Sequence, residues 1–449
     1  MRMKKIANIP SNYGKIYTQN QYQTPLHIQQ LEKIVLNTVL FTENGRLIVT
    51  MPPRHGKSEY ISKYLPAWYL ANFPNRRIIL TSYEASFAFD WAFKAKEVYK
   101  YISIFENLPK LKIERMNYWV TEAGGSMTAV GAGGAITGKG ADLLIIDDPI
   151  KNAEQALSSG QREKLWEWFN AVALTRLEPK GKIIIVQTRW HEDDLAGRLL
   201  KTSDKWTLLK MPAIDGNGKA LWEERFSVEY LEEIKRQIGT YWWNCLYQQE
   251  PISQDNRIFK TEYWRYYDTE VEDGFVIQSW DTAFKTSTLN DYSVCTTWAV
   301  EDGKYYLLDL YRGKIEFPDL VRQVKLEFDK YKPRIILIED AASGQSLIQQ
   351  LRRDTALPIK PVKAESDKVV RANLILPLLE NGLVYLPSNS IKTRDVVEEC
   401  ASFPLGAHDD IVDSITQALY YLQNIRPNNN GVGVFNFKSK KSKVFGALQ

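Results

Sequence analysis

Residues 46–58 have the side-chain types and spacing of a nucleotide-phosphate site. An apolar strand pattern leads through Met-Pro-Pro-Arg-His to Gly56, Lys57 and Ser58. In a strand, loop and helix of this kind, backbone amides cradle phosphate, the lysine binds the β- and γ-phosphates and the hydroxyl binds Mg²⁺. Met51 stands where the usual pattern has its first glycine. The loop alone therefore supports nucleotide binding and an ordinary strand-to-helix turn about equally.

Two further strand patterns end in residues that such a site needs. The run 143–146 is followed by Asp147 and Asp148, and the run 183–186 leads to Thr188. An acid at the first of these ends can hold Mg²⁺, directly or through water, and the next acid can orient or deprotonate the attacking water. Two acids after a strand are often only a polar loop, but behind a phosphate loop in this order they indicate an ATPase.

The glycine-rich segment 131–140 carries a single cation, Lys139. We expect either a loop close to the nucleotide or a mobile element that offers Lys139 to the phosphates of a neighbouring subunit. Arg176 is the competing candidate for such a trans-acting finger, because guanidinium binds phosphate oxygens bidentately and ammonium does not.

A second group of acids lies in the C-terminal half of the chain. Asp281 and Glu339 each close an apolar strand pattern, and Asp410 opens a helical stretch. Carboxylates that converge from different strands can hold two Mg²⁺ or Mn²⁺ ions about 3.5–4 Å apart, one activating water and one stabilising the leaving oxygen of a phosphodiester. Asp340 and Asp409 stay open as alternatives to Glu339 and Asp410.

The apolar runs also predict the elements that position these residues. From about 20 to 210, buried-strand patterns alternate with helical ones, which predicts a mostly parallel sheet covered by helices on both faces. From about 270, three strand patterns separated by turn residues predict an antiparallel meander, followed by a helix and a parallel strand. This order outlines a ribonuclease H-like fold.

Composition narrows the class of protein. With 449 residues, 44% of them hydrophobic, and no run near the roughly 18 apolar residues of a membrane span, we expect a cytoplasmic protein without membrane contact. The three cysteines and four histidines are scattered, so a metal would be a hard ion held by carboxylates. The formal charge of +4 neither indicates nor excludes a nucleic-acid partner.

Taken in order, residues 51–58, 145–149 and 188–195 resemble the large subunit of tailed-phage terminase, the DNA-packaging motor. The resemblance implies an α/β chain with an N-terminal P-loop ATPase domain of the RecA/ASCE type and a C-terminal ribonuclease H-like nuclease domain. It implies a site for ATP and Mg²⁺ built from Arg54, His55, Gly56, Lys57, Ser58, Glu59, Asp147 and Thr188. Many members have glutamate as the catalytic acid, so Asp148 as the base stays open.

The C-terminal half resembles the terminase nuclease at 280–281, 290–293, 338–340 and 408–413. By this resemblance the ligands of two Mg²⁺ or Mn²⁺ ions are Asp281, Glu339 and Asp410, with Asp409 as second choice and Asp291 and His408 as conditional or outer contacts. Residues 366–373 match as well, and Lys368 and Arg371, three apart on a helix, could contact the DNA backbone. A solvated basic face is the alternative for these two cations.

The resemblance implies ATP-driven translocation of double-stranded DNA into the procapsid and cutting of concatemeric DNA, in the host cytoplasm. The implied partners are the portal protein, a small terminase subunit and further copies of the chain in a ring of five. A DNA-repair helicase-nuclease and a non-catalytic prophage-derived DNA- or capsid-docking protein are the alternatives. We expect domains at 1–210 and 266–425, a connecting subdomain at 211–265 and a basic tail without regular structure at 426–449.

Overall fold

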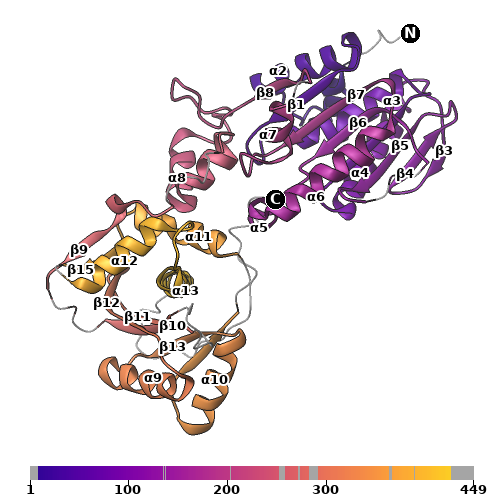
Figure 1. Ribbon diagram of the computed structural model, residues 1–449. Coiled ribbons are helices and arrows are strands. Elements are labelled where there is room, and N and C mark those ends of the chain that lie inside the picture. Colours follow the sequence, from indigo (N-terminus) through magenta and orange to yellow (C-terminus); the bar gives the residue numbers. More distant parts are fainter. Residues whose placement is uncertain are drawn as a thin grey trace. The chain divides into compact units, whose positions relative to one another are not determined.

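The computed structural model describes residues 9–134, 136, 138–202, 204–251, 258–269, 271, 274–282, 292–363, 367–388 and 390–425. These form two compact units. The first contains the described residues up to 235 together with 241–251, and the second contains 236–240 and the described residues from 258 onward. Each unit has its own sheet with helices around it (Figure 1), so the predicted α/β class is confirmed.

The first unit is built on an eight-stranded sheet of order β3-β4-β5-β2-β6-β7-β1-β8. Its strands are β1 (Arg46–Thr50), β2 (Arg77–Ser82), β3 (Leu111–Glu114), β4 (Tyr118–Thr121), β5 (Ser126–Gly131), β6 (Ala141–Asp147), β7 (Leu177–Gln187) and β8 (Thr207–Lys210). Strand β4 pairs antiparallel to both β3 and β5, and the other pairings described for this sheet are parallel. Because β7 lies between β1 and β6 and is parallel to both, the carboxyl ends of these three strands meet at one edge.

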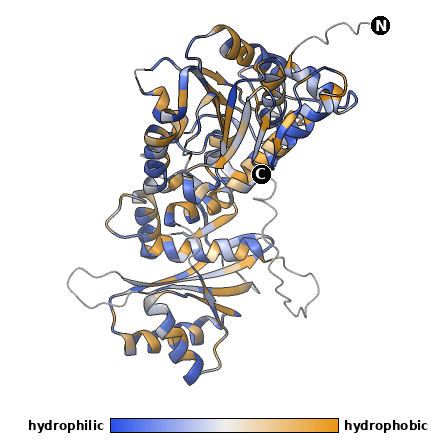
Figure 2. Cartoon of the chain, turned by 90° about the vertical axis from the view of Figure 1, so that its right-hand side faces the viewer, coloured by the Kyte–Doolittle hydropathy of each residue, from blue (hydrophilic) through white to orange (hydrophobic). Residues whose placement is uncertain are grey.

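Helices cover this sheet, and both of its faces are buried. The helices are α1 (Pro10–Tyr17), α2 (Leu26–Leu36), α3 (Leu65–Asn72), α4 (Ala85–Ile102), α5 (Ala153–Leu157), α6 (Ser159–Trp168) and α7 (Leu195–Leu200). A further helix, α8 (Val228–Trp242), is interrupted at Gly239 and has residues 236–240 in the second unit. Val49 and Leu80 pack into one core, and the residues before them, Ile48 and Ile79, which point to the other face, are 0% exposed. The strands are accordingly mostly hydrophobic in Figure 2, as the continuous apolar runs predicted.

The second unit contains a seven-stranded sheet of order β14-β13-β10-β11-β12-β15-β9. Its strands are β9 (Arg265–Tyr267), β10 (Phe275–Asp281), β11 (Ser293–Glu301), β12 (Lys304–Gly313), β13 (Ile335–Glu339), β14 (Ile359–Val362) and β15 (Val384–Pro387). Strands β10, β11 and β12 form the predicted antiparallel meander, and β13 pairs parallel to β10. The predicted ribonuclease H-like strand order is therefore confirmed.

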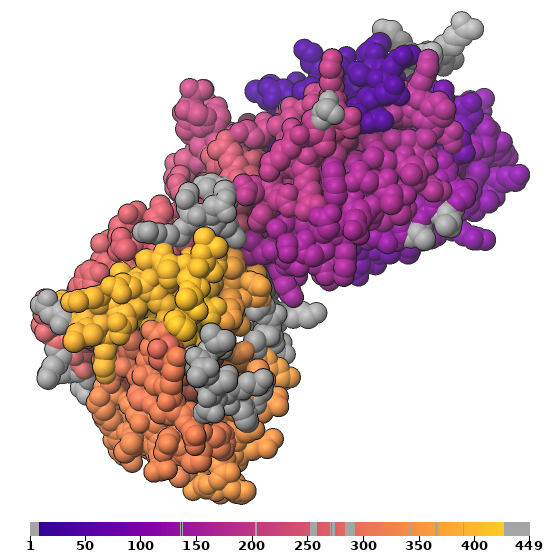
Figure 3. Space-filling view, viewed as in Figure 1, coloured from indigo at the N-terminus to yellow at the C-terminus, as the bar shows by residue number. Residues whose placement is uncertain are grey.

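The helices of the second unit divide between the two faces of its sheet. They are α9 (Phe317–Tyr331), α10 (Ala342–Asp354), α11 (Lys368–Glu380), α12 (Ile391–Ser402) and α13 (Asp410–Asn424). Helices α9 and α10 pack with Trp280 and Ile338, whereas α11, α12 and α13 pack with Ile277 and Trp298. Side chains on the two faces of β10 thus pack against different helices. Residues of the C-terminal helices, coloured yellow, are visible at the surface in Figure 3. No helix in the described ranges has the length and apolarity to cross a membrane.

Candidate functional sites

The phosphate loop, residues 51–58, follows β1 and opens a helical segment whose first turn is a π-helix, Glu59–Tyr64. Met51, in the place of the usual glycine, is 0% exposed in the core and continues the line of β1. Gly56 has a φ of +89°, and a Cβ there would lie 3.2 Å from Ile28 Cδ1, so glycine is required at this position. Arg54 is also left-handed, at φ 62°. The loop therefore turns at Arg54 and Gly56 rather than at its first residue.

Lys57 is held between two groups at the carboxyl edge of the sheet. Its Nζ donates to Thr188 Oγ1 at 2.9 Å and lies 3.1 Å from Asp148 Oδ2. Asp148 Oδ1 in turn accepts from the Thr188 backbone N–H at 2.8 Å. The three side chains come from segments after β1, β6 and β7, which the strand order brings together. A lysine placed this way can pair with phosphate oxygens, with an acid and a strand-tip hydroxyl beside it.

Asp147 is fully buried and receives two hydroxyl hydrogen bonds. Ser58 Oγ donates to its Oδ1 at 2.8 Å and Ser62 Oγ to its Oδ2 at 2.7 Å. Burial and then repulsion from Asp148 raise the pKa of Asp147, while the two serines and Lys57 act against that rise. A carboxylate beside a hydroxyl is a donor set that Mg²⁺ takes, and a divalent cation there would offset both causes of the raised pKa. These residues fit the metal.

A pocket of about 520 Å³ opens beside the phosphate loop. This volume is in the range of small-molecule sites. Its walls include Arg54, Gly56, Lys57, Ser58, Glu59, Asp148 and Thr188, together with the aromatic or apolar residues Tyr22, Ile28 and Trp222 and with Gln23 and Arg225. Polar groups suited to phosphate and flat apolar groups suited to a base thus line one cavity. Tyr22 and Gln23 thus face the pocket, and the chain enters α2 shortly after them, at Leu26.

Two residues predicted to contact the nucleotide, His55 in the loop and Glu59 directly after it, have partners within the protein. The ring of His55 is buried, stacks on Phe226 at 4.7 Å and bonds through Nδ1 to Pro53 O at 2.8 Å; it is not among the pocket walls. Burial lowers the pKa of His55 to about 4, so the ring is neutral near pH 7. Glu59 faces the pocket but pairs with Lys63 at 3.0 Å. We infer that His55 supports the shape of the loop, while the neighbouring residues Arg54 and Gly56 face the pocket.

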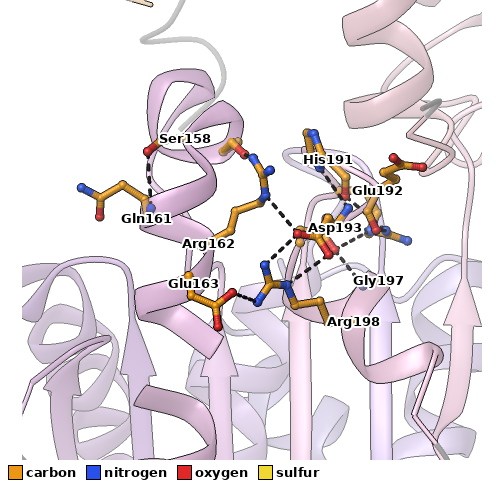
Figure 4. A network of polar contacts seen from close by, with 12 residues as sticks. Ser158, Gln161, Arg162, Glu163, His191, Glu192, Asp193, Gly197 and Arg198 are labelled. Atoms are coloured by element: carbon orange, nitrogen blue, oxygen red, sulfur yellow. Dashed lines mark hydrogen bonds and ion pairs between the residues drawn. The ribbon is translucent and has the colours of Figure 1, made fainter. Parts of the chain in front are cut away.

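The loop after β7 is tied to two helices by charged groups. Asp193 accepts from Arg162 Nε of α6 at 3.4 Å and from Arg198 Nη2 of α7 at 2.8 Å, and Arg198 also pairs with Glu163 at 2.7 Å. Figure 4 shows both arginines converging on Asp193. Thr188 begins this loop, so one segment carries both the contact with Lys57 and the contacts with α6 and α7.

A buried ion pair fixes the same loop from within. Asp194 is 0% exposed, and both of its carboxylate oxygens accept from Arg189 Nε, the closer at 2.8 Å. Asp194 also accepts from Gly197 N at 2.9 Å, which caps α7. The Arg189–Asp194 pair therefore fixes the position of the backbone next to Thr188 relative to the start of α7.

The two finger candidates lie outside the pocket of their own chain. Lys139 Nζ lies 3.6 Å from the centre of the Tyr118 ring and donates to Thr128 Oγ1 at 3.3 Å. Arg176 is the last residue of a short 3₁₀ turn, Leu174–Arg176, and its guanidinium donates to the neighbouring Thr175 hydroxyl at 3.1 Å. A role of either side chain in a neighbouring subunit stays a prediction.

The predicted nuclease acids gather at one place in the second unit. Asp281 ends β10 and Glu339 ends β13, its parallel neighbour, while Asp410 begins α13. Burial, followed by repulsion from Asp413, Glu339 and Asp410, raises the pKa of Asp281 well above its usual range, and Lys368 opposes the rise. We call Asp281, Glu339, Asp410 and Asp413 the carboxylate cluster. Four acids that repel one another are a donor set for a hard cation.

The alternative acids Asp409 and Asp340 lie next to members of the cluster in the chain. Asp409 precedes α13 and pairs with Lys368 at 2.8 Å. The backbone N–H of Asp340 donates to Val362 O at 2.7 Å. Within the described ranges, no three His, Cys, Asp or Glu side chains are arranged to hold one metal ion together. A bound ion would therefore have to draw the carboxylate cluster closer. Asp291, predicted as a conditional ligand, lies outside the described residues.

Lys368 and Arg371 form ion pairs with the carboxylate cluster. Both lie on the first turns of α11, and both reach Asp413, from Lys368 Nζ at 2.7 Å and from Arg371 Nη2 at 2.6 Å. Asp413 is 6% exposed in this arrangement. The two cations are thus part of the site and not a separate solvated face. Lys368, 47% exposed, is the one that solvent reaches more readily.

A buried polar network holds α13 against β10 and β11. Ser414 Oγ donates to Ser279 O at 2.8 Å, and Ser279 Oγ returns a bond to Ser414 O at 2.8 Å. The Thr296 and Ser414 hydroxyls lie 2.7 Å apart, and Gln417 Nε2 donates to Ser279 Oγ at 2.9 Å. These short side chains allow close approach of helix and sheet, which brings Asp410 and Asp413 to the strand end that carries Asp281.

Sequence reasoning missed several residues of both sites. Ser62 had a usable signal, because it lies four residues after Ser58 in a helical segment and can reach the same acid. Trp222 and Arg225 had none, since only folding brings them to the pocket. Glu399 of α12, whose carboxylate accepts from Ile411 N at the start of α13, likewise had no spacing that would reveal it.

Comparison with known proteins agrees with this arrangement. Residues 48–262 match the family model "Terminase large subunit, T4likevirus-type, N-terminal", and residues 278–422 match "Terminase RNaseH-like domain". Among solved structures, the large terminase of a thermophilic bacteriophage in complex with ADP is 14% identical, with a TM-score of 0.50 over 92% of this chain and 98% of that one. The HK97 bacteriophage large terminase is 12% identical, with a TM-score of 0.39 over 82% and 86%. No curated protein sequence matches.

The two matched ranges follow one another in the order of the two units, and they extend from the phosphate loop to the helix of Asp410. The ADP-bound terminase structure shares the fold of nearly the whole chain. Both predicted halves of the resemblance are therefore found in one polypeptide, and the chain belongs to the family of tailed-bacteriophage terminase large subunits.

Proposed function

We propose that this chain hydrolyses ATP to move double-stranded DNA into a procapsid and cuts concatemeric DNA with a separate, metal-dependent nuclease site. The observation that carries the ATPase half is the mutual contact of Lys57, Asp148 and Thr188 beside Asp147, at the carboxyl ends of the parallel strands β1, β6 and β7. An ordinary strand-to-helix turn that binds no ligand does not need these four polar residues close together. The thermophilic-phage relative in complex with ADP supports a nucleotide as ligand of this fold.

In the ATPase, Lys57 and Arg54 bind the phosphates, while Ser58 and Asp147 hold Mg²⁺. When bound, Mg²⁺ neutralises charge on the phosphates. Asp148 accepts a proton from the attacking water or orients it, and its contact with Lys57 keeps the carboxylate at the phosphate end of the pocket. Thr188 contacts Lys57 and lies at the start of the loop held by Asp193. We infer that loss of the γ-phosphate changes the position of Thr188 and, through that loop, of α6 and α7.

In the nuclease, we propose that Asp281, Glu339 and Asp410 hold one or two Mg²⁺ or Mn²⁺ ions. When bound, the ions activate water and stabilise the leaving oxygen of the phosphodiester. Lys368 and Arg371 contact the DNA backbone once it approaches, since phosphate competes with Asp413 for both cations. Contacts of this kind carry no sequence information, which suits an enzyme that must travel along a whole genome.

The proposed setting follows from the family. The chain acts in the host cytoplasm as a ring of five copies on the portal protein of the procapsid, and a small terminase subunit selects the DNA. In such a ring, Lys139 or Arg176 would reach the nucleotide of the adjacent copy.

One experiment separates the two sites. Lys57→Ala should abolish ATP hydrolysis and leave plasmid cutting in Mn²⁺ largely intact, and Asp281→Ala should do the reverse, because the two residues belong to different compact units. Steady-state ATPase and plasmid-nicking assays on the full chain measure both. Glu398→Gln, an exposed acid of α12, is the control and should leave both activities unchanged. If each of the two substitutions abolishes both activities in folded protein, the two-site proposal is wrong.

A further inference from the structure

Glu399 is a buried acid next to Asp410. Its side chain is 6% exposed, and its Oε1 accepts from the backbone N–H of Ile411 at 2.6 Å. Ile411 is the second residue of α13, and Asp409, which precedes the helix, provides no side-chain cap of its own. A carboxylate from α12 thus satisfies an amide that the first turn of α13 leaves open, at the positive end of the helix dipole. The turn that carries Asp410 is fixed from another helix.

The second oxygen of Glu399 continues the contact towards the sheet. Arg312 Nη2 of β12 lies 3.0 Å from Glu399 Oε2. The Arg312 guanidinium also lies over the ring of Tyr292, 4.0 Å from its centre. The backbone N–H of Tyr292 donates to Asp410 Oδ2 at 3.4 Å. The path from Glu399 through Arg312 and Tyr292 therefore returns to Asp410.

A third contact comes from the residue two before Asp410. The His408 ring meets the Tyr292 ring edge-on at 5.3 Å, and His408 Nδ1 lies 3.9 Å from Asp410 Oδ2. The Asp410 carboxylate is consequently bounded by the backbone of Tyr292 and by His408, while Glu399 fixes the main chain on which it sits.

We propose that Glu399 and Arg312 are positioning residues of the nuclease: they hold Asp410 in the orientation in which it binds the catalytic metal ion. This inference rests on the proposed function of the carboxylate cluster. Partners that lie behind metal ligands commonly change metal affinity about 10- to 100-fold when they are replaced. A residue that serves stability alone would change the melting temperature of the protein and leave its metal affinity unaltered.

Mn²⁺ binding to the full chain without DNA or nucleotide tests the inference. The amount of free Mn²⁺ is read from its electron paramagnetic resonance signal, and the binding that is lost in Asp281→Ala defines the nuclease site. Glu399→Gln keeps an oxygen acceptor for Ile411 N and removes the charge that faces Arg312. We expect it to weaken Mn²⁺ binding at that site about 10- to 100-fold. Arg312→Lys should weaken it in the same direction, because ammonium lacks the flat surface that covers Tyr292.

Glu398→Gln is the matched control, since Glu398 is the exposed neighbour of Glu399 on the same helix, and its Mn²⁺ affinity should equal that of the unchanged chain. Asp410→Asn shows how much Mn²⁺ affinity is lost when a direct ligand of the ion is replaced. Folded Glu399→Gln and Arg312→Lys proteins with unchanged affinity, even with lower melting temperatures, would overturn the inference while Asp410→Asn still supports the nuclease. If the unchanged chain neither binds Mn²⁺ at Asp281 nor cuts DNA, the proposed function fails, and this inference fails with it.

Discussion

Replacing Ser62 with alanine tests the arrangement around Asp147. Ser62 Oγ donates one of the two hydroxyl hydrogen bonds that Asp147 receives, at 2.7 Å, and both side chains are 0% exposed. Water cannot easily replace the bond in such a place. A hydrogen bond to a charged group contributes about 1.5–3 kcal/mol. In the proposed site Mg²⁺ binds the ionised form of Asp147, so Ser62→Ala should raise the Mg²⁺ concentration that gives half-maximal ATP hydrolysis by about 10- to 150-fold.

The pH dependence of this effect has a definite sign. The pKa of Asp147 is raised by burial and by Asp148, so protons compete with Mg²⁺, and the Mg²⁺ requirement falls as pH rises through that pKa. Ser62 is one of the groups that act against the rise. Its removal therefore moves the fall in Mg²⁺ requirement to higher pH.

ATP hydrolysis at saturating ATP, titrated with Mg²⁺ at several pH values, measures both effects. Ser86→Ala is a matched control, because Ser86 is exposed and bonds only to the exposed Glu84 at 3.0 Å among the contacts described for its hydroxyl. A folded Ser62→Ala protein with an unchanged Mg²⁺ requirement and pH profile would refute the assigned role of Asp147. So would an equal change in Ser86→Ala.

Two further predictions concern stability, both measured by denaturant unfolding of the full chain. Asp194→Ala should lower the free energy of unfolding by about 3–5 kcal/mol, because it leaves the guanidinium of Arg189, 10% exposed, without its carboxylate. Asp193→Ala removes an acid that is 35% exposed and should lower it by at most about 1 kcal/mol. Equal losses in the two variants would contradict the buried-pair argument. At Asp309, burial raises the pKa, but hydrogen bonds from Lys330, Lys392 and Tyr331 outweigh it and lower the pKa to about 2. A depressed pKa contributes stability that is present above the unfolded value of 3.8 and is lost as pH falls through about 2. In Asp309→Asn, the free energy of unfolding should therefore no longer fall by this contribution, about 2 kcal/mol, across that pH window. An unchanged pH profile of stability would contradict the prediction.

The sequence by itself determined which segments form the main strands of the two sheets and how these strands follow one another along the chain. Continuous apolar runs are buried on both faces, so they predicted the parallel strands β1, β2, β6 and β7. Turn residues between shorter runs predicted the meander of β10, β11 and β12. The acids at strand ends were visible because a carboxylate interrupts the apolar run that precedes it, even where folding buries it, as at Asp147. Local pattern was enough for each of these inferences.

Only the tertiary structure decided which of these residues meet. The order of strands places β7 between β1 and β6, and this brings Thr188 to Lys57 across 131 positions of the chain. Packing of α13 on β10, through Ser279 and Ser414, brings Asp410 to Asp281. From the sequence, Lys368 and Arg371 fitted a solvated basic face as well as a DNA contact, whereas the structure places both of them in ion pairs with Asp413. Glu399 shares no local pattern with Asp410, because their contact depends on how two helices pack, and long-range packing leaves no period in the sequence.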